Sequence, residues 1–178
     1  MKSLRFVLPV VILLSTVALA QSDAQKSFDT MKTLAGAWSG PATIDPPMPG
    51  MTPGTRTQIS MRVTSRGNAL VHEMYEPGKE NDPAKYDHPV TMFYLDEGRL
   101  LLTHYCDAGN RPRMTGKVSP DGKTVEFDFV DLAGGNQHGH MYHALFTIID
   151  PNHHIEDWTY MIPGDKLIHA RLDLQREK

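Results

Sequence analysis

The feature of the sequence that most constrains the fold is a long succession of short segments in which apolar and polar residues alternate. The succession begins at Trp38 and continues almost to the end of the chain. Its segments are rich in Val, Ile, Thr, Phe and Tyr, and clusters of Gly, Pro, Asn and Asp separate them. This pattern is typical of consecutive antiparallel strands. We expect about ten strands, over residues 36–44, 55–65, 69–76, 89–95, 99–106, 112–118, 123–130, 140–149, 154–162 and 166–175.

The connections between these segments predict the order of the strands. Four connections are so short that they join neighbouring antiparallel strands and leave no room for crossover helices. They are Asp96-Glu97-Gly98, Ser119-Pro120-Asp121-Gly122, Asp150-Pro151-Asn152 and Pro163-Gly164-Asp165. We therefore expect an all-β meander, which removes its two exposed edges most easily by closing into a barrel. Such a barrel can hold a small ligand, and the longer segments 45–54 and 77–89 are predicted to be loops at its mouth.

The residues before the first strand predict a leader and a short helix. The first twenty residues have a basic start, an apolar run and small residues before Gln21, which is typical of a cleaved secretory signal. We therefore expect export to the periplasm or the medium and one barrel domain over residues 21–178. Residues 22–34 carry helical spacing, with Phe28, Met31 and Leu34 on one stripe.

Charge and cysteine content narrow the classes of partner. The formal net charge is −3, and loss of the two cations Lys2 and Arg5 with the leader makes it −5. Because the chain also has no basic block, we expect no nucleic-acid partner. The single cysteine, Cys106, lies far from the leader, so a lipid anchor has no acceptor and no stable membrane anchor is expected. Cys106 cannot form an internal disulfide and is therefore buried and inert, reactive, a ligand, or paired between chains.

Two stretches resemble known families. Leu34-Ala35-Gly36-Ala37-Trp38-Ser39-Gly40 resembles the LxGxWxG start of lipocalin-like and nitrobindin-like barrels, which are also similar to fatty-acid-binding proteins. In physical terms, a glycine begins the first strand and the Trp plugs the closed end of the barrel. Residues 103–114 carry a THYCxxxNxPRM pattern that is similar to uncharacterised exported bacterial proteins. The first resemblance implies a calycin-like barrel, and the second implies no activity.

The strongest functional lead is the stretch 100–114, LLLTHYCDAGNRPRM. One face of the predicted strand is apolar and ends in the imidazole of His104 and the thiol of Cys106. Such a face suits a barrel interior, where His104 could act as acid, base or ligand because its unperturbed pKa lies near neutrality. The alternative is a hydrogen-bonded structural histidine.

Polar residues follow this strand across a glycine turn. Asn110 and Arg113 are candidate ligand-binding residues, and Arg111 shares the face of Arg113. An arginine that points into the barrel needs a partner, because burial of an unpaired guanidinium is costly. That partner could be Glu73, Asp128 or an anionic group of the ligand.

Several histidines raise the question of a metal or haem. His138 and His140 alternate on one predicted strand and could clamp a divalent metal with His104 or Cys106, although the usual metal-binding spacings are absent. His169 lies where the resemblance to nitrobindin-like barrels implies an axial haem ligand. However, its strand has its apolar face on the other side, which indicates that His169 faces solvent. The sequence does not determine a cofactor.

Two further positions could contact a ligand. Trp158 shares a strand face with Glu156 and Tyr160, which suits an amphipathic or ring-containing ligand at the rim of a pocket. Glu73 alternates with His72, so only one of these two can point inward.

The leading hypothesis is an exported barrel that binds a small, partly apolar ligand, whose polar or anionic group would contact His104, Arg113 and His140. The alternatives are an enzyme that uses His104 for acid–base chemistry, and a metal- or haem-binding barrel. The sequence contains no nucleophile elbow, phosphate-binding loop or dinucleotide fingerprint. It therefore leaves open whether the protein is an enzyme and which residues would be catalytic.

Overall fold

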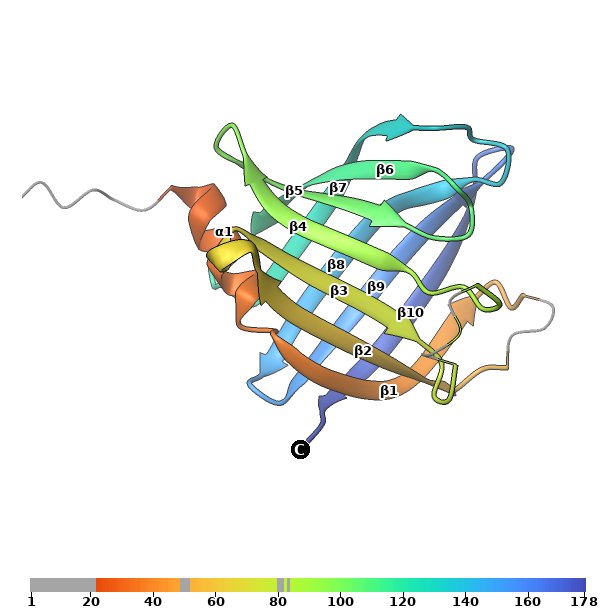
Figure 1. Cartoon of the computed structure of the whole chain (residues 1–178), viewed down its shortest axis with the longest axis horizontal. Coiled ribbons are helices and arrows are strands. Elements are labelled where there is room, and N and C mark those ends of the chain that lie inside the picture. The colour runs from red at the N-terminus through yellow and green to blue at the C-terminus, as the bar shows by residue number, and fades with distance from the viewer. Residues whose placement is uncertain (1–21, 49–51, 80–81, 83) are drawn as a thin grey trace, which may run out of the picture.

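The chain forms one closed antiparallel barrel. The computed structural model describes residues 22–48, 52–79, 82 and 84–178, so the predicted leader at 1–20 lies outside the described residues. Ten strands pair in sequence order, and β1 pairs with β10 to close the sheet (Figure 1).

The elements are α1 (Asp23–Lys32), β1 (Gly36–Asp45), β2 (Thr55–Thr64), the short helix η1 (Ser65–Gly67), β3 (Ala69–Tyr75), β4 (Val90–Asp96), β5 (Arg99–Tyr105), β6 (Arg111–Val118), β7 (Thr124–Ala133), β8 (His140–Asp150), β9 (His153–Ile162) and β10 (Lys166–Arg176). The predicted all-β meander, its closure and its short N-terminal helix are confirmed.

Tight turns set the register of neighbouring strands. Asp96 pairs with Arg99, and the two residues between them, Glu97 and Gly98, both have positive φ. This is the backbone geometry of the two-residue turn that matches the right-handed twist of antiparallel strands. Gly164 and Asp165 repeat this pair of positive φ values between β9 and β10. The turn residues of the sequence therefore specify the meander directly.

Helix α1 closes one end of the barrel (Figure 1). Ser22 caps the helix by accepting a hydrogen bond from the backbone of Gln25, and Phe28 and Met31 are buried against the barrel core. The helix ends at Lys32, slightly earlier than predicted. The Trp38 indole then donates to the carbonyl of Leu34 at 2.8 Å, which fixes the chain as it turns into β1. Neither α1 nor another helix in the described part of the chain is long and apolar enough to cross a bilayer.

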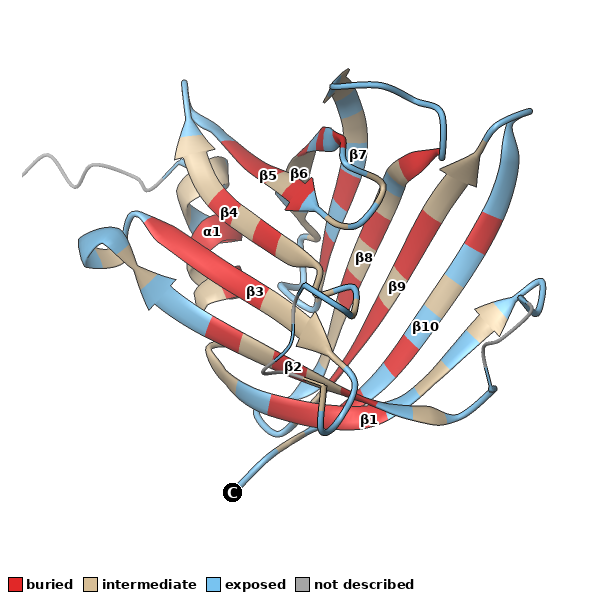
Figure 2. Ribbon diagram, turned by 45° about the vertical axis from the view of Figure 1, so that its right-hand side comes forward, coloured by how far each residue is buried: buried red, intermediate tan, exposed pale blue. Residues whose placement is uncertain are grey.

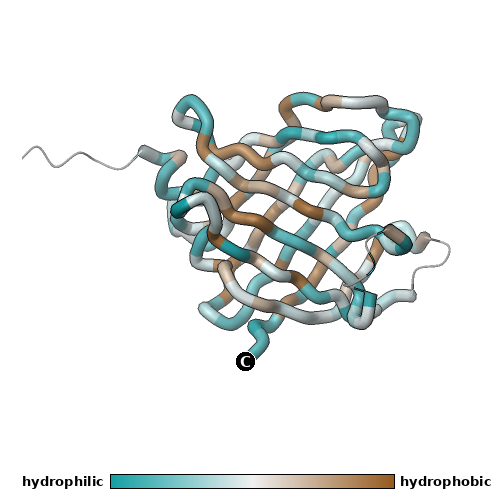
Figure 3. The backbone as a smooth tube through the Cα atoms, viewed as in Figure 1, coloured by the Kyte–Doolittle hydropathy of each residue, from teal (hydrophilic) through white to brown (hydrophobic). Residues whose placement is uncertain are grey.

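Aromatic side chains fill the middle of the barrel next to α1. The rings of Phe93, Phe127 and Phe146 contact one another with centroids 5.3 to 5.9 Å apart. Buried and exposed residues alternate along the strands, as Figure 2 shows for β10, and the apolar residues in Figure 3 lie within the strands rather than in the loops. This part of the barrel is therefore a packed core.

The close approach of β1 and β10 leads to a stability prediction. A Cβ atom at Gly40 would lie 1.8 Å from the backbone oxygen of Asp173, so the substitution Gly40→Ala forces the two strands apart. We expect it to lower the free energy of unfolding by about 1–3 kcal/mol in urea denaturation. Thr43→Ala, on the exposed face of the same strand, is the control; it removes only a long, exposed hydrogen bond of 3.5 Å to the Arg171 carbonyl and should change it by less than about 0.5 kcal/mol. Equal stability of Gly40→Ala and the control would contradict this account of the β1–β10 seam.

Candidate functional site: a cavity at the open end of the barrel

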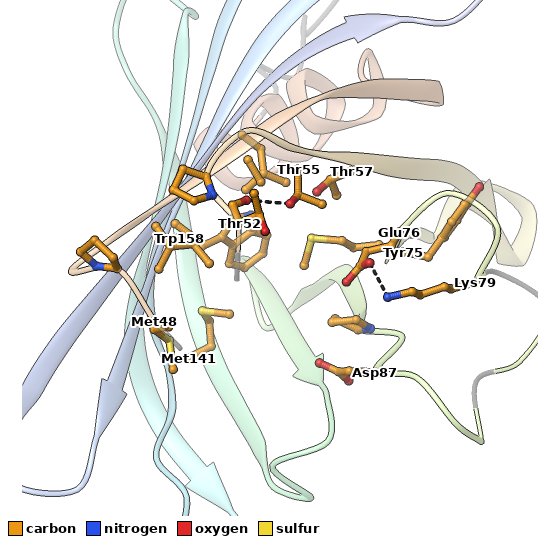
Figure 4. A pocket seen from close by; sticks show the side chains of 18 residues that line it. Met48, Thr52, Thr55, Thr57, Tyr75, Glu76, Lys79, Asp87, Met141 and Trp158 are labelled. Atoms are coloured by element: carbon orange, nitrogen blue, oxygen red, sulfur yellow. Dashed lines mark hydrogen bonds and ion pairs between the residues drawn. The ribbon is translucent and has the colours of Figure 1, made fainter. Parts of the chain in front are cut away.

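A cavity of about 460 Å³ occupies the end of the barrel opposite α1. Its wall is formed by residues of β1, β2, β3, β8, β9 and β10 and of the loops beside them, and Figure 4 shows its side chains. Part of the lining is apolar, with Met74, Met141, Trp158, Ala170 and Leu172. Polar and charged residues, including Thr55, Thr57, Glu76, Lys79 and Asp87, also line it.

The two irregular segments of the sequence contribute to this cavity. Pro47, Met48 and Pro53 come from the segment 45–54, and Lys79 and Asp87 come from the segment 77–89. The position of these residues agrees with the prediction that the two segments lie at the mouth of the barrel. Positions 49–51, 80–81 and 83 lie outside the described residues.

Trp158 is held in the cavity wall by a buried carboxylate. Its indole nitrogen donates to Glu156 Oε2 at 2.9 Å. The same oxygen lies 3.0 Å from His72 Nε2, and the other oxygen of Glu156 lies 3.0 Å from His154 Nε2. Glu156 and His154 are both 0 % exposed. Three polar hydrogens therefore point at one carboxylate inside the barrel, which compensates for much of its lost hydration.

A second polar group lies beside this network. His72, Thr91 and His104 face one another in register across β3, β4 and β5. Thr91 Oγ1 lies 2.8 Å from His104 Nδ1, and both residues are buried. The rings of His72 and His104 lie 5.8 and 5.7 Å from the Trp158 ring, centroid to centroid. Both imidazoles therefore lie next to the indole that lines the cavity.

Burial and charge set the protonation of these groups. Burial by itself raises the pKa of Glu156, but the electrostatic interaction with His72 and the hydrogen bonds from His154 and His72 outweigh it. The net pKa of Glu156 is lowered, so the group is a carboxylate at neutral pH. Burial, with a smaller effect of His72, lowers the pKa of His104 to about 3. His104 is therefore uncharged at neutral pH, and general-acid chemistry near neutrality would require this pKa to rise.

The structure brings only part of the predicted site together. Trp158 lines the cavity and His104 points into the barrel, as the alternation predicts. Arg113 does not point into the barrel, so its predicted inward placement is wrong. Pro112 and Met114 take the inner face of β6, and Arg113 makes a two-pronged ion pair with Asp131 on the solvent side. The apolar side chains of this strand occupy the interior and leave the guanidinium in water.

Two other predicted residues, Glu73 and Asn110, lie away from the cavity. His72 rather than Glu73 points inward, because Leu70 and Met74 share its face and belong to the core side of β3. Asn110 is buried and donates to the carbonyls of Gly135 and Gly139, so it ties the β5–β6 loop to the β7–β8 loop. This set of contacts gives Asn110 a structural role.

Cys106 lies in the loop after β5. It is a free, half-buried cysteine beside a shallow hollow that also contains Asp87 and His88. Burial raises the pKa of the Cys106 thiol, with the charges of Asp87 and Asp107 adding to the effect. The thiol is therefore protonated at neutral pH and is a poor nucleophile there.

The histidines considered for metal binding do not converge. A register shift between Met141 and His143 puts Met141 in the cavity wall in place of His140. His140 instead packs against Phe129 and its Nδ1 lies 3.0 Å from Asn136 Oδ1, while His138 is exposed. The predicted shared strand face of the two histidines does not form, because β8 begins at His140 and His138 lies in the loop before it.

His169 is exposed on the outer face of β10, with its Nδ1 3.1 Å from Thr159 Oγ1. This agrees with the solvent-facing position that its strand pattern indicates. Within the described residues, one group of three side chains has metal-ligand spacing: Glu126, Asp128 and His143, on the outer wall. These three residues lie on the outside of the barrel rather than in the cavity wall.

Four residues of the buried network are absent from the predicted site. His72, Thr91 and His154 were not among its candidates, and Glu156 was expected at the rim of a pocket rather than at 0 % exposure. A signal for part of the network exists in the alternation His154, Glu156, Trp158, which places an imidazole, a carboxylate and an indole on one strand face. Its convergence with His72 requires the barrel geometry.

The network leads to a second stability prediction. Replacement of Glu156 by Ala leaves His72, His154 and Trp158 without their common acceptor inside the barrel. We expect a loss of about 3–5 kcal/mol in the free energy of unfolding. The matched control is Glu126→Ala, which removes a surface carboxylate from an exposed pair with His143 and should cost less than about 1 kcal/mol. Similar losses for the two variants in urea denaturation would contradict the assignment of Glu156 as the central acceptor.

The lowered pKa of His104 predicts an acid sensitivity. An unfolded chain binds the proton near pH 6.5, whereas the folded protein binds it only near pH 3. The unfolded state therefore binds more protons, and the free energy of unfolding falls as the pH drops below 6.5, by up to about 1.4 kcal/mol per pH unit. His104→Gln should have a flatter pH dependence between 6.5 and 5.5, above the range in which Glu156 begins to contribute. Parallel curves for the two proteins would show that His104 is not the responsible group.

Comparisons with known proteins agree with the barrel fold. No protein-family model and no curated protein matches the sequence. Among solved structures, the chain is similar to the crystal structure of Rv2717c from M. tuberculosis, with a TM-score of 0.61, 13 % sequence identity, and coverage of 85 % of this chain and 98 % of that one. It is also similar to a protein of unknown function of the DUF3598 family from Nostoc punctiforme, with a TM-score of 0.43, 10 % identity, and coverage of 83 % and 48 %. The first of these similarities supports a common fold and nothing finer.

Proposed function

We propose that the protein is an exported carrier that binds a small, largely apolar molecule in the cavity at the open end of the barrel. The observation that carries the proposal is the division of the barrel interior. Phe93, Phe127 and Phe146 fill the half next to α1, whereas the other half contains a cavity of about 460 Å³. This volume lies in the range of about 300–1,000 Å³ that is usual for small-molecule sites.

The lining of the cavity supports an amphipathic ligand. Met74, Met141 and Trp158 offer apolar surface, and methionine adapts to irregular ligand shapes. Near them, Glu76 and Lys79 form an ion pair, and Asp87 adds a second carboxylate (Figure 4). A ligand can bury an apolar body beside Trp158 and keep polar groups near these charges.

The route to the outside of the cell is part of the same proposal. The basic, apolar and small-residue order of positions 1–20 supports a secretory leader. A carrier function fits an exported barrel because a closed wall shields an apolar molecule from water without a chemical step. The acid–base alternative has less support, because a pKa of about 3 makes His104 a weak base and His104 does not line the cavity.

Filling the cavity tests this proposal. The neutral fluorescent probe N-phenylnaphthylamine should bind the wild-type protein with increased emission. Ala42→Phe places a ring in the cavity wall and should weaken binding by about tenfold or more, or about 1.4 kcal/mol. Thr43→Phe adds the same ring to the exposed face of the same strand and should bind as the wild type does. Circular dichroism checks that both variants keep the fold.

Two results would contradict the carrier proposal. One is the absence of binding by the wild-type protein to this probe and to a set of apolar molecules that fit the cavity. The other is binding that Ala42→Phe leaves unchanged, because the probe would then lie outside the cavity.

A further inference from the structure

The cavity lining contains a carboxylate, Asp87, that has no ion-pair partner among the described residues. The two other charged side chains of the lining, Glu76 and Lys79, form an ion pair with each other. Asp87 instead accepts from the backbone N–H of Asp107 at 3.0 Å and from the backbone of His88, and both donors are uncharged. The lining therefore carries two carboxylates and one ammonium, and the Asp87 charge is not compensated.

The surroundings of Asp87 are themselves negative. Asp87 is exposed at the mouth, yet neighbouring atoms remove part of its hydration. This desolvation and the charge of Asp107 raise the pKa of Asp87, while the backbone hydrogen bonds and, least of all, the His88 imidazole lower it. The net rise is not large, so Asp87 is still ionised at neutral pH.

Other groups near Asp87 offer no positive charge to pair with it. Burial raises the pKa of Tyr160 to about 12, and Cys106, Asp107 and Asp87 add to the effect. Tyr160 is therefore uncharged at neutral pH, as is the Cys106 thiol. Lys85 lies over the ring of its neighbour Tyr86, with Nζ 5.0 Å from the ring centroid, and makes no ion pair with Asp87. A cation at this part of the mouth would be attracted and an anion repelled.

The groups deeper in the barrel do not reverse this preference. Glu156 lies beyond Trp158, and the positive electrostatic effect of His72 opposes its negative charge. Neither Glu156 nor His72 lines the cavity. The one ammonium of the lining, Lys79, already holds Glu76, so an anion could reach it only by competing with that carboxylate. The charge preference of the cavity is therefore set at its mouth, by Asp87.

We infer that the ligand of the cavity is a cationic amphipath, a protonated amine or ammonium compound whose apolar body packs against Met141 and Trp158 and whose charged head contacts Asp87. In Figure 4, Asp87 lies across the cavity from these two apolar residues. This inference rests on the proposed carrier function and specifies the ligand class of the same cavity. It also replaces the anionic group that the sequence suggested, since Arg113 pairs with Asp131 on the solvent side.

Competition among three eight-carbon probes tests the inference. Octylamine, octanol and octanoate displace N-phenylnaphthylamine from the wild-type protein at pH 7 and low ionic strength, where exposed charges are least screened. We expect octylamine to bind about fivefold to tenfold more tightly than octanoate. A high salt concentration should reduce this ratio, because Asp87 is exposed to solvent.

Three substitutions locate the preference. Asp87→Asn should weaken octylamine by about threefold to fivefold, as expected for one exposed ion pair. It should leave octanol unchanged, which also shows that the variant keeps its cavity. Asp128→Asn is the matched control, since it removes the same charge from the outer wall and should leave all three affinities unchanged. Asp87→Lys reverses the charge at the mouth, so octanoate should then bind more tightly than octylamine.

The possible failures are distinguishable. If octanoate binds the wild type as tightly as octylamine, or if Asp87→Asn weakens octylamine no more than Asp128→Asn does, the cationic subsite is wrong. The carrier function still stands in that case, provided that octanol displaces the dye and Ala42→Phe abolishes its binding. If neither the dye nor any of the three probes binds the wild type, the carrier proposal fails and the subsite fails with it.

Discussion

The carboxylate of Glu156 is the group on which the interior of this barrel depends. It belongs to β9, yet it accepts from His72 on β3, a strand 84 residues away in sequence that does not pair with β9. This contact connects two walls of the barrel across the interior. The same carboxylate fixes the Trp158 indole and His154, and the His154 ring packs edge-on against Trp38 with centroids 4.2 Å apart. One charged group therefore links the packed end of the barrel to the cavity wall.

This arrangement explains why the interior is divided. Next to α1, aromatic rings fill the lumen, and burial of apolar area supplies the stability that a barrel with an open end needs. Beyond Glu156 the side chains that point inward are smaller or more flexible, as with Ala42, Ala170 and Met74. The cavity is thus the part of the interior that no ring fills, and Trp158 is its boundary with the polar groups beneath. A network that holds the indole in place also determines how deep a ligand can enter.

The sequence predicts most of the fold because its signals are local. Alternation and tight turns determine each strand and its neighbours, and the observed strand limits differ from the expected ones by three residues at most. The inward faces of β5 and β9, with His104 and Trp158, follow from the same alternation. The prediction failed for Arg113 because Pro112 and Met114 compete for the same interior, and for His140 because a bulge shifts the register of β8. Alternation along a strand does not tell how deep a residue lies along the barrel axis. Glu156 was therefore expected at the rim, whereas it lies at the centre of the barrel.

The central claim is that the open half of the barrel is a binding cavity that ends at Trp158. A crystal structure of the protein soaked with a bromine-labelled octanol tests it most directly, because the anomalous signal locates the bromine independently of the fitted side chains. We expect one strong bromine peak inside the barrel, among Met74, Met141 and Trp158. Bromine found only on the outer surface, with the open half filled by the protein's own side chains, would contradict it.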